Sequence, residues 1–176
     1  MPNRRDHIPR ELERALLIES GHRCAIPTCR AVAPLEIDHI DDWARVREHK
    51  FENMIVLCRN CHGLKGDGPR QLNRQALRQY KVNLGVVNSR YGDTERRVLE
   101  FFANNPLVND IMLPGGLDIL LLYLIKDGLL AKPPPAGGIY FGSVPMHQPY
   151  FLTEAGREFV SRWSAAQPVS GEVQIS

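Results

Sequence analysis

Two short apolar stretches in the first half of the chain have the pattern of β-strands. LEIDHI, at residues 35–40, alternates apolar and polar positions, and MIVLC, at residues 54–58, is almost continuously apolar. Both patterns are typical of strands. The residues between them, 41–52, are mostly charged and are expected to form a loop.

Helical patterns surround these two strands. Residues 9–20, PRELERALLIES, place apolar residues at helical spacing between a proline and a glycine that suit helix ends. Residues 58–68, CRNCHGLKGDG, are expected to start a short helix that ends at the glycines. Residues 70–81, RQLNRQALRQYK, are expected to form a polar helix.

The chain changes character around Gly85–Gly92, and helix and strand patterns then start again. Helices are expected over 93–104 and 117–127, strands around the Pro/Gly-rich turn within 129–152, and a closing helix over 153–163 that Thr153 caps. The predicted fold class is α+β. We expect one domain over residues 1–88, a second over 89–166, and a flexible tail over 167–176.

Composition and charge limit the classes of protein that fit these elements. The longest apolar stretch, Leu117–Ile125, is far too short to span a bilayer, and the first residues have no apolar signal core, so a cytoplasmic protein is expected. Residues 1–90 hold 16 Lys and Arg against 11 Asp and Glu, a balance of +5, whereas residues 91–176 hold 6 against 9, a balance of −3. The first half could therefore bind a polyanion, or its charge could be ordinary surface.

The four cysteines occur as two pairs. Cys24 and Cys29 form C-x4-C, and after 28 intervening residues Cys58 and Cys61 form C-x2-C. Two cysteine pairs spaced in this way can bring four thiolates to one tetrahedral zinc ion. Cysteines of cytosolic proteins are more often metal ligands or free thiols than disulfides. Because the cysteines would fill all four ligand positions, this zinc is expected to be structural. The alternative is four unrelated buried thiols.

An Asp-His pair lies between the cysteine pairs, and another histidine follows the last cysteine. Asp38 and His39 are neighbours on a predicted strand, so their side chains point in opposite directions and suit two different tasks. A carboxylate suits a hard cation such as Mg²⁺, and an imidazole suits a general base. His62 could offer a nitrogen to the same cation, or it could replace a cysteine on the zinc.

These residues together resemble the HNH nucleases, also called ββα-metal nucleases, in their zinc-binding branch. The matching motifs are LEIDHI, Asn53 in ENMIVLC, and CRNCHGLK, and the first cysteine pair departs from the family's more frequent C-x2-C. The resemblance implies that His39 activates water and that Asp38 and His62 hold one catalytic Mg²⁺ or Mn²⁺. It also implies that Asn53 braces the loop between the strands and helps to fix the His39 ring. DNA would be cleaved to 5′-phosphate and 3′-hydroxyl ends.

Several residues near this motif are also given expected roles. Glu36 alternates with Asp38 on the strand and could accept a hydrogen bond in the second shell. Asp42 is expected to be solvated in the loop, and His49 to be a surface residue. Phosphate contacts are expected from five basic residues: Lys65, Arg59, Arg70, Arg74 and Arg78. The three arginines at 70, 74 and 78 recur every four residues, as in a backbone-binding stripe or a solvated helix face.

The end of the second half, YFLTEAGREFVSRW, resembles the close of winged-helix domains, in which L-T-x-x-G leads a strand into a last helix. The expected recognition helix, GLDILLLYLIKDG, is nearly all apolar and has Lys126 as its single cation. A role in protein interaction or homodimerisation is therefore favoured over DNA reading.

The sequence predicts a metal-dependent endonuclease whose expected substrate is double-stranded DNA. A role in restriction or defence is suggested by analogy. One alternative is a zinc-stabilised nucleic-acid-binding regulator without cleavage activity. Another is a nuclease that the second half gates in response to a ligand or partner.

Overall fold

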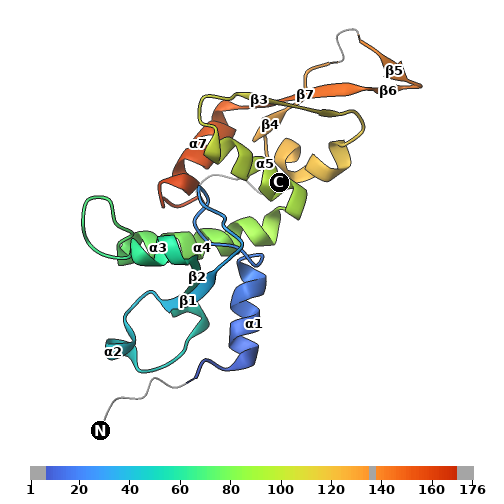
Figure 1. Ribbon diagram of the computed structural model, residues 1–176. Helices are drawn as coiled ribbons and strands as arrows, with labels where there is room; N and C mark the ends of the chain where they lie inside the picture. The colour runs from blue at the N-terminus through green and yellow to red at the C-terminus, as the bar shows by residue number, and fades with distance from the viewer. Residues whose placement is uncertain (1–6, 135–137, 170–176) are drawn as a thin grey trace. The chain divides into compact units, whose positions relative to one another are not determined.

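The computed structural model describes residues 7–134 and 138–169 (Figure 1). The chain divides into two compact units, one running to Gly85 and taking in Ala165–Pro168, the other comprising Val86–Ser164 and the residues from Val169. Helices and strands occur in both units, so the predicted α+β class is confirmed. Among the described residues no helix is both long and apolar enough to cross a membrane.

An antiparallel hairpin forms the centre of the first unit. It consists of β1 (Leu35–His39) and β2 (Met54–Cys58), paired from Leu35 opposite Cys58 to His39 opposite Met54. Both predicted strands are confirmed.

Strand β2 is buried along its whole length because helices cover both of its faces. Met54 and Val56 pack with Leu16 of α1 (Arg10–Glu19), whereas Ile55 and Leu57 pack with residues of α4 (Arg74–Arg90) such as Leu77. A strand with no solvent-facing side has no polar positions to alternate, which explains the continuous apolar run.

The other helices of this unit differ in part from expectation. The short helix α3 (Arg59–Gly63) follows β2 directly, as predicted, and packs against both strands. The expected loop 41–52 contains α2 (Trp43–Val46) and the 3-10 turn η1 (Phe51–Asn53). The helix predicted over 70–81 was misplaced: α4 begins at Arg74, where the Asn73 side chain accepts from the Ala76 backbone N–H, and it continues to Arg90.

The second unit combines a three-stranded antiparallel sheet with helices. Its sheet has the order β3-β7-β4, and a separate hairpin joins β5 to β6. The elements are α5 (Asp93–Asn104), β3 (Asp110–Pro114), η2 (Asp118–Leu121), α6 (Leu122–Lys126), β4 (Leu130–Ala131), β5 (Tyr140–Phe141), β6 (Val144–Pro145), β7 (His147–Leu152) and α7 (Glu154–Ser164).

The sequence patterns predicted most of the second unit. The helices over 93–104 and 153–163 are confirmed, and the helix over 117–127 is divided into η2 and α6. Strand β3 was missed. Thr153 accepts a hydrogen bond from Gly156 at the start of α7, and a side chain at Gly156 would meet the Leu129 carbonyl at 2.2 Å, which explains the glycine in L-T-x-x-G.

The division between the units falls between Gly85 and Val86, within helix α4. Helix α4 runs without a break through the expected boundary, beginning in the first unit and ending in the second. Gln167, expected in a flexible tail, accepts a hydrogen bond from the Asn83 side chain at 2.9 Å. The rest of that expected tail, 170–176, and residues 135–137 of the Pro/Gly-rich turn lie outside the described residues.

Candidate active site

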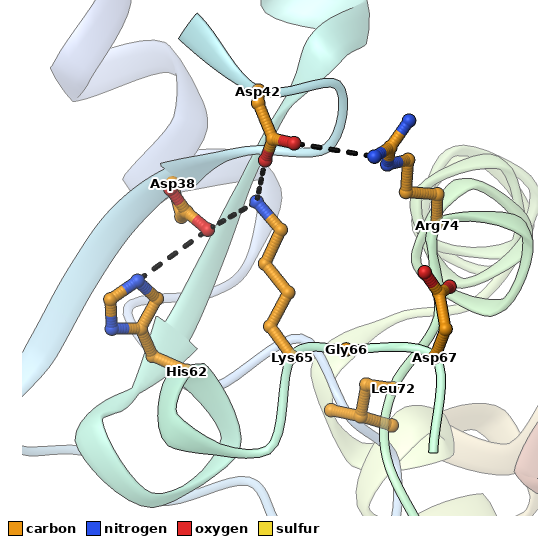
Figure 2. A pocket seen from close by; sticks show the side chains of 8 residues that line it. All are labelled: Asp38, Asp42, His62, Lys65, Gly66, Asp67, Leu72 and Arg74. Carbon is orange, nitrogen blue, oxygen red and sulfur yellow. Dashed lines mark hydrogen bonds and ion pairs between the residues drawn. The ribbon is translucent and has the colours of Figure 1, made fainter. Parts of the chain in front are cut away.

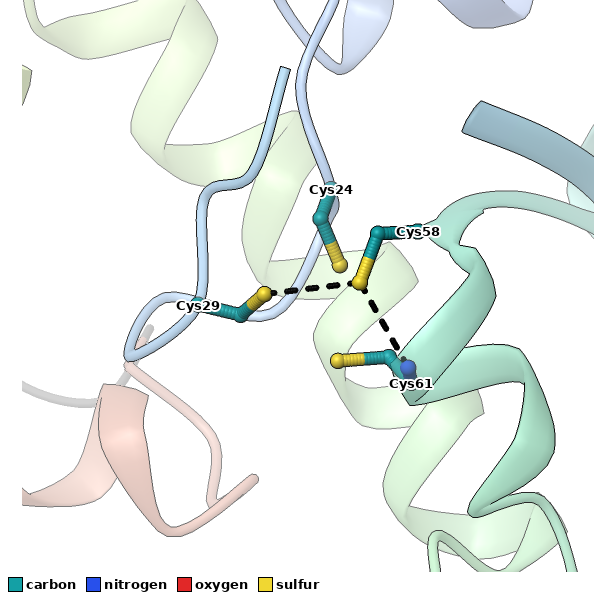
Figure 3. Close-up of side chains that lie close together, drawn as sticks. All are labelled: Cys24, Cys29, Cys58 and Cys61. Atoms are coloured by element: carbon teal, nitrogen blue, oxygen red, sulfur yellow. Dashed lines mark hydrogen bonds between the residues drawn. The ribbon is translucent and has the colours of Figure 1, made fainter. Parts of the chain in front are cut away.

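The four cysteines converge between the first loop and the start of α3 (Figure 3). Their sulfur atoms all lie within 4.8 Å of one another, and Cys29 Sγ is 3.6 Å from Cys58 Sγ. Zn–S bonds of about 2.3 Å in a tetrahedron place sulfur atoms about 3.8 Å apart. The cluster therefore has the donor set and the size that a zinc ion requires, without His62.

The electrostatics of the cluster favour one thiolate at Cys58. Burial by itself would raise its pKa, but the backbone N–H of Cys61 and the Cys29 thiol stabilise the anion and lower the pKa to about 7. Burial raises the pKa of Cys24 to about 11 and also raises that of Cys61. A bound cation would offset the cost of further thiolates in this buried place.

A cavity of about 430 Å³ opens between β1, α3 and the start of α4 (Figure 2). Asp38 reaches it from β1 and His62 from α3, which packs against β1, so the two side chains come to one place. His62 Nε2 lies 3.5 Å from Asp38 Oδ2. Cis ligands of an octahedral Mg²⁺ lie about 3 Å apart, so this pair needs only a small adjustment to share an ion.

Lys65 places its ammonium group beside Asp38 Oδ2, the oxygen that faces His62. Its Nζ is 2.9 Å from Asp38 Oδ2, 3.3 Å from Asp42 Oδ1 and 2.5 Å from the His39 carbonyl oxygen. Three oxygen acceptors from one strand end and the following loop thus converge on a cation. This end of the cavity is built to accommodate positive charge.

A scan against protein-family models matches residues 22–68 to the HNH endonuclease family. The chain carries an HNH endonuclease domain at residues 22–68. Searches of curated proteins and of solved structures gave no significant match. The matched segment contains the cysteine cluster, the hairpin, α3 and the end of the cavity around Lys65, which supports the family to which the motifs pointed.

Asn53 closes the base of the loop in the HNH domain. Its side-chain oxygen accepts from the Asp41 backbone N–H at 2.8 Å, and its side-chain nitrogen donates to the Asp41 carbonyl at 3.1 Å. The backbone N–H of Ile40 donates to the Asn53 carbonyl at 2.8 Å. These contacts fit the expected bracing of the loop between the strands, because both ends of the loop are tied at one residue.

His39 lies on the opposite side of β1 from Asp38, and its side chain does not line the cavity. It is 1% exposed, its Nε2 is 3.2 Å from His49 Nδ1, and its ring centroid is 5.4 Å from that of Trp43. Trp43 stacks on His49 with a centroid separation of 4.6 Å. Two side chains of the connecting loop therefore cover the residue expected to be the base.

The five basic residues expected to contact phosphate do not all lie at the cavity. Arg59 Nε is 3.7 Å from Glu36 Oε1, Arg74 is 3.3 Å from Asp42, and Arg78 pairs with Asp41. Arg70 precedes α4, so the stripe of three arginines on one helix is wrong. Arg74 and Lys65 line the cavity, where they could contact a phosphate group.

Sequence reasoning underestimated three residues of the loop. Asp42 lines the cavity instead of being merely solvated, His49 faces His39 instead of solvent alone, and Trp43 was given no role. Asp42 follows Asp38 by four residues, but no periodicity applies across a strand end, so sequence spacing offered no signal for it. An aromatic residue in an otherwise charged loop was the one signal available for Trp43.

Proposed function

We propose that the HNH domain is a metal-dependent endonuclease that hydrolyses phosphodiester bonds of DNA. The observation that carries this proposal is the meeting of Asp38 and His62 at one cavity, 3.5 Å apart, on β1 and α3, two elements that pack against each other. Their donor set of one carboxylate and one imidazole, with the His39 carbonyl nearby, suits Mg²⁺ or Mn²⁺.

A divalent ion held there would act as a Lewis acid on the scissile phosphate and on the departing 3′ oxygen. Asp38 and His62 would fix its position, and Lys65 and Arg74 lie close enough to bind non-bridging phosphate oxygens after leaving their carboxylate partners. Cleavage of this kind yields 5′-phosphate and 3′-hydroxyl ends.

We assign the general base to His39, which would take the proton of the attacking water. In the arrangement described above, its ring is buried beside Trp43 and His49, across β1 from Asp38, so this role requires those two side chains to move away and the ring to turn toward the cavity. The indole Nε1 of Trp43 is buried and has no hydrogen-bond partner among the described residues. An unsatisfied buried donor costs about 1–3 kcal/mol, which favours release of Trp43 from this position.

We propose structural zinc at the cysteine cluster. Cys58 precedes α3 and Cys61 lies within it, next to His62. The Cys24–Cys29 loop is bound to the hairpin through a hydrogen bond from Ala25 N to Val56 O. Zinc at this point would fix α3 against the hairpin and so keep Asp38 and His62 at the spacing that a shared ion requires.

The second unit supports a winged-helix-like assignment through its element order. After α5 come a strand, a helical segment, a second strand, a hairpin in the position of a wing, and a third strand that pairs between the other two. We propose that this unit mediates protein interaction or homodimerisation, which would suit cleavage of both strands of a duplex. A cytoplasmic location and a role in restriction or defence remain hypotheses of the same kind.

Plasmid nicking tests the proposed function. Zinc-loaded protein should nick supercoiled plasmid with Mg²⁺ or Mn²⁺ and stop when a chelator removes the added ion. His39→Ala and His62→Ala should each lower the rate by at least about 100-fold with zinc content unchanged. Nicking that survives both substitutions would contradict the assignment.

The alternatives give different results in the same assay. Salt-sensitive binding of DNA without nicking at any ion concentration would favour a zinc-stabilised regulator. Nicking that starts only after addition of a cell extract or small-molecule pool would favour a nuclease gated through the second unit.

A further inference from the structure

Glu36 and His62 form a close pair on the side of the imidazole that faces away from Asp38. Glu36 Oε2 is 2.7 Å from His62 Nδ1, while His62 Nε2 is turned toward Asp38 Oδ2. The second oxygen of Glu36, Oε1, faces Arg59, whose Nε is 3.7 Å away on an exposed side chain.

The fold makes this pairing specific. Glu36 and Asp38 are two residues apart on β1 and therefore project from the same face of the strand. His62 lies in the last turn of α3, which packs against that strand. One carboxylate thus meets each nitrogen of a single ring.

We infer that Glu36 is a positioning residue for the divalent ion, acting through His62. Nδ1–H donates to the Glu36 carboxylate, which sets the tautomer with the lone pair on Nε2 and holds the ring with Nε2 toward Asp38. A carboxylate on the far nitrogen of a ligating histidine also makes the ligand more basic. This inference rests on the proposed function only in placing an ion between Asp38 and His62.

The geometry excludes direct ligation by Glu36 alongside Nε2. The two ring nitrogens point in diverging directions, so an oxygen at 2.7 Å from Nδ1 is on the wrong side of the ring to share an ion bound at Nε2. Glu36 therefore acts on the ion only by orienting His62.

Manganese binding tests the inference without nucleic acid. Mn²⁺ affinity of zinc-loaded protein would be measured by titration calorimetry and by the loss of the free-ion electron paramagnetic resonance signal. Glu36→Ala should weaken binding about 10- to 100-fold, and Glu36→Gln should weaken it less, because the amide oxygen still accepts from Nδ1–H. Glu13→Ala, which removes an exposed carboxylate of α1, is the matched control and should bind as wild type does.

A double substitution separates positioning from ligation. In a His62→Ala background, Glu36→Ala should cause no further loss of Mn²⁺ affinity. An equal further loss would overturn the inference, because Glu36 would then act on the ion directly. Wild-type affinity in the single Glu36→Ala protein would overturn it as well.

Folding controls and the nicking assay distinguish a failure of this inference from misfolding and from a failure of the proposed function. Zinc content and thermal unfolding show whether each variant is folded, and Glu36→Gln decides the question if Glu36→Ala does not fold. Absence of nicking by wild-type protein would overturn the proposed function and leave the Mn²⁺ comparison valid. Nicking by wild-type protein together with Mn²⁺ affinity that is indifferent to Glu36 would overturn this inference alone.

Discussion

The ammonium group of Lys65 occupies oxygen contacts that a divalent ion would use. It lies 2.9 Å from Asp38 and 2.5 Å from the His39 carbonyl. An ion entering the cavity must displace this internal cation. Lys65→Met should therefore tighten Mn²⁺ binding about fivefold, the equivalent of an ion pair of about 1 kcal/mol, while plasmid nicking falls because a phosphate contact is lost.

A second lysine provides the control for that measurement. Lys50 pairs with Glu48 at 2.7 Å on the loop, and Lys50→Met removes the same charge outside the cavity. It should leave Mn²⁺ affinity unchanged. If Lys65→Met binds Mn²⁺ no better than wild type does, Lys65 does not compete with the ion.

The spacing of cysteine, aspartate and histidine residues along the chain predicted which side chains meet at the site. It missed the contacts that depend on how individual side chains are oriented. The cysteine pairs cluster as their spacing indicated, and Asp38 and His62 meet at the cavity. The positions of Lys65 and His49 follow from how a loop and a helix end fold over β1. No periodic rule governs those conformations.

Trp43 and His49 make the connecting loop a cover for His39. If their release makes the base accessible, Trp43→Ala should raise the rate at which diethylpyrocarbonate modifies His39, by several-fold. Peptide mass spectrometry would measure that rate at each histidine. The exposed His22 serves as the internal control, since its rate should stay the same. Equal His39 rates in both proteins would show that Trp43 does not shield the ring.

Elements with strong periodicity were predictable, and those defined by pairing or by caps were not. Strands β1 and β2 and helices α1, α5 and α7 appear where the patterns put them. Strand β3 carries only alternate partly buried positions and pairs with β7, some 35 residues away, so its identity depends on a distant partner. The start of α4 depends on the Asn73 cap, which outweighed the helical spacing of the preceding residues.

At the scale of the whole molecule, the two units have separate sources of stability. The first unit holds its hairpin between small clusters around Leu57 and Leu16, next to the cysteines. The second unit has one larger apolar cluster that includes Phe102, Tyr150 and Trp163. A small unit with a modest core depends more on a metal staple than a unit with its own continuous core.

Loss of the zinc should therefore unfold one unit and spare the other, and the chain has a reporter for each. Trp43 belongs to the first unit and Trp163 to the second, and the sequence has 2 tryptophans in all. Structural zinc contributes about 10 kcal/mol or more, comparable to the whole stability of a small domain. In a Trp163→Phe background, Cys61→Ser should abolish the cooperative thermal transition of Trp43 fluorescence. In a Trp43→Phe background, the same change should leave the Trp163 transition where it was, because its cluster contains no cysteine. A shared shift of both transitions would mean that the continuous helix α4 couples the units into one cooperative whole.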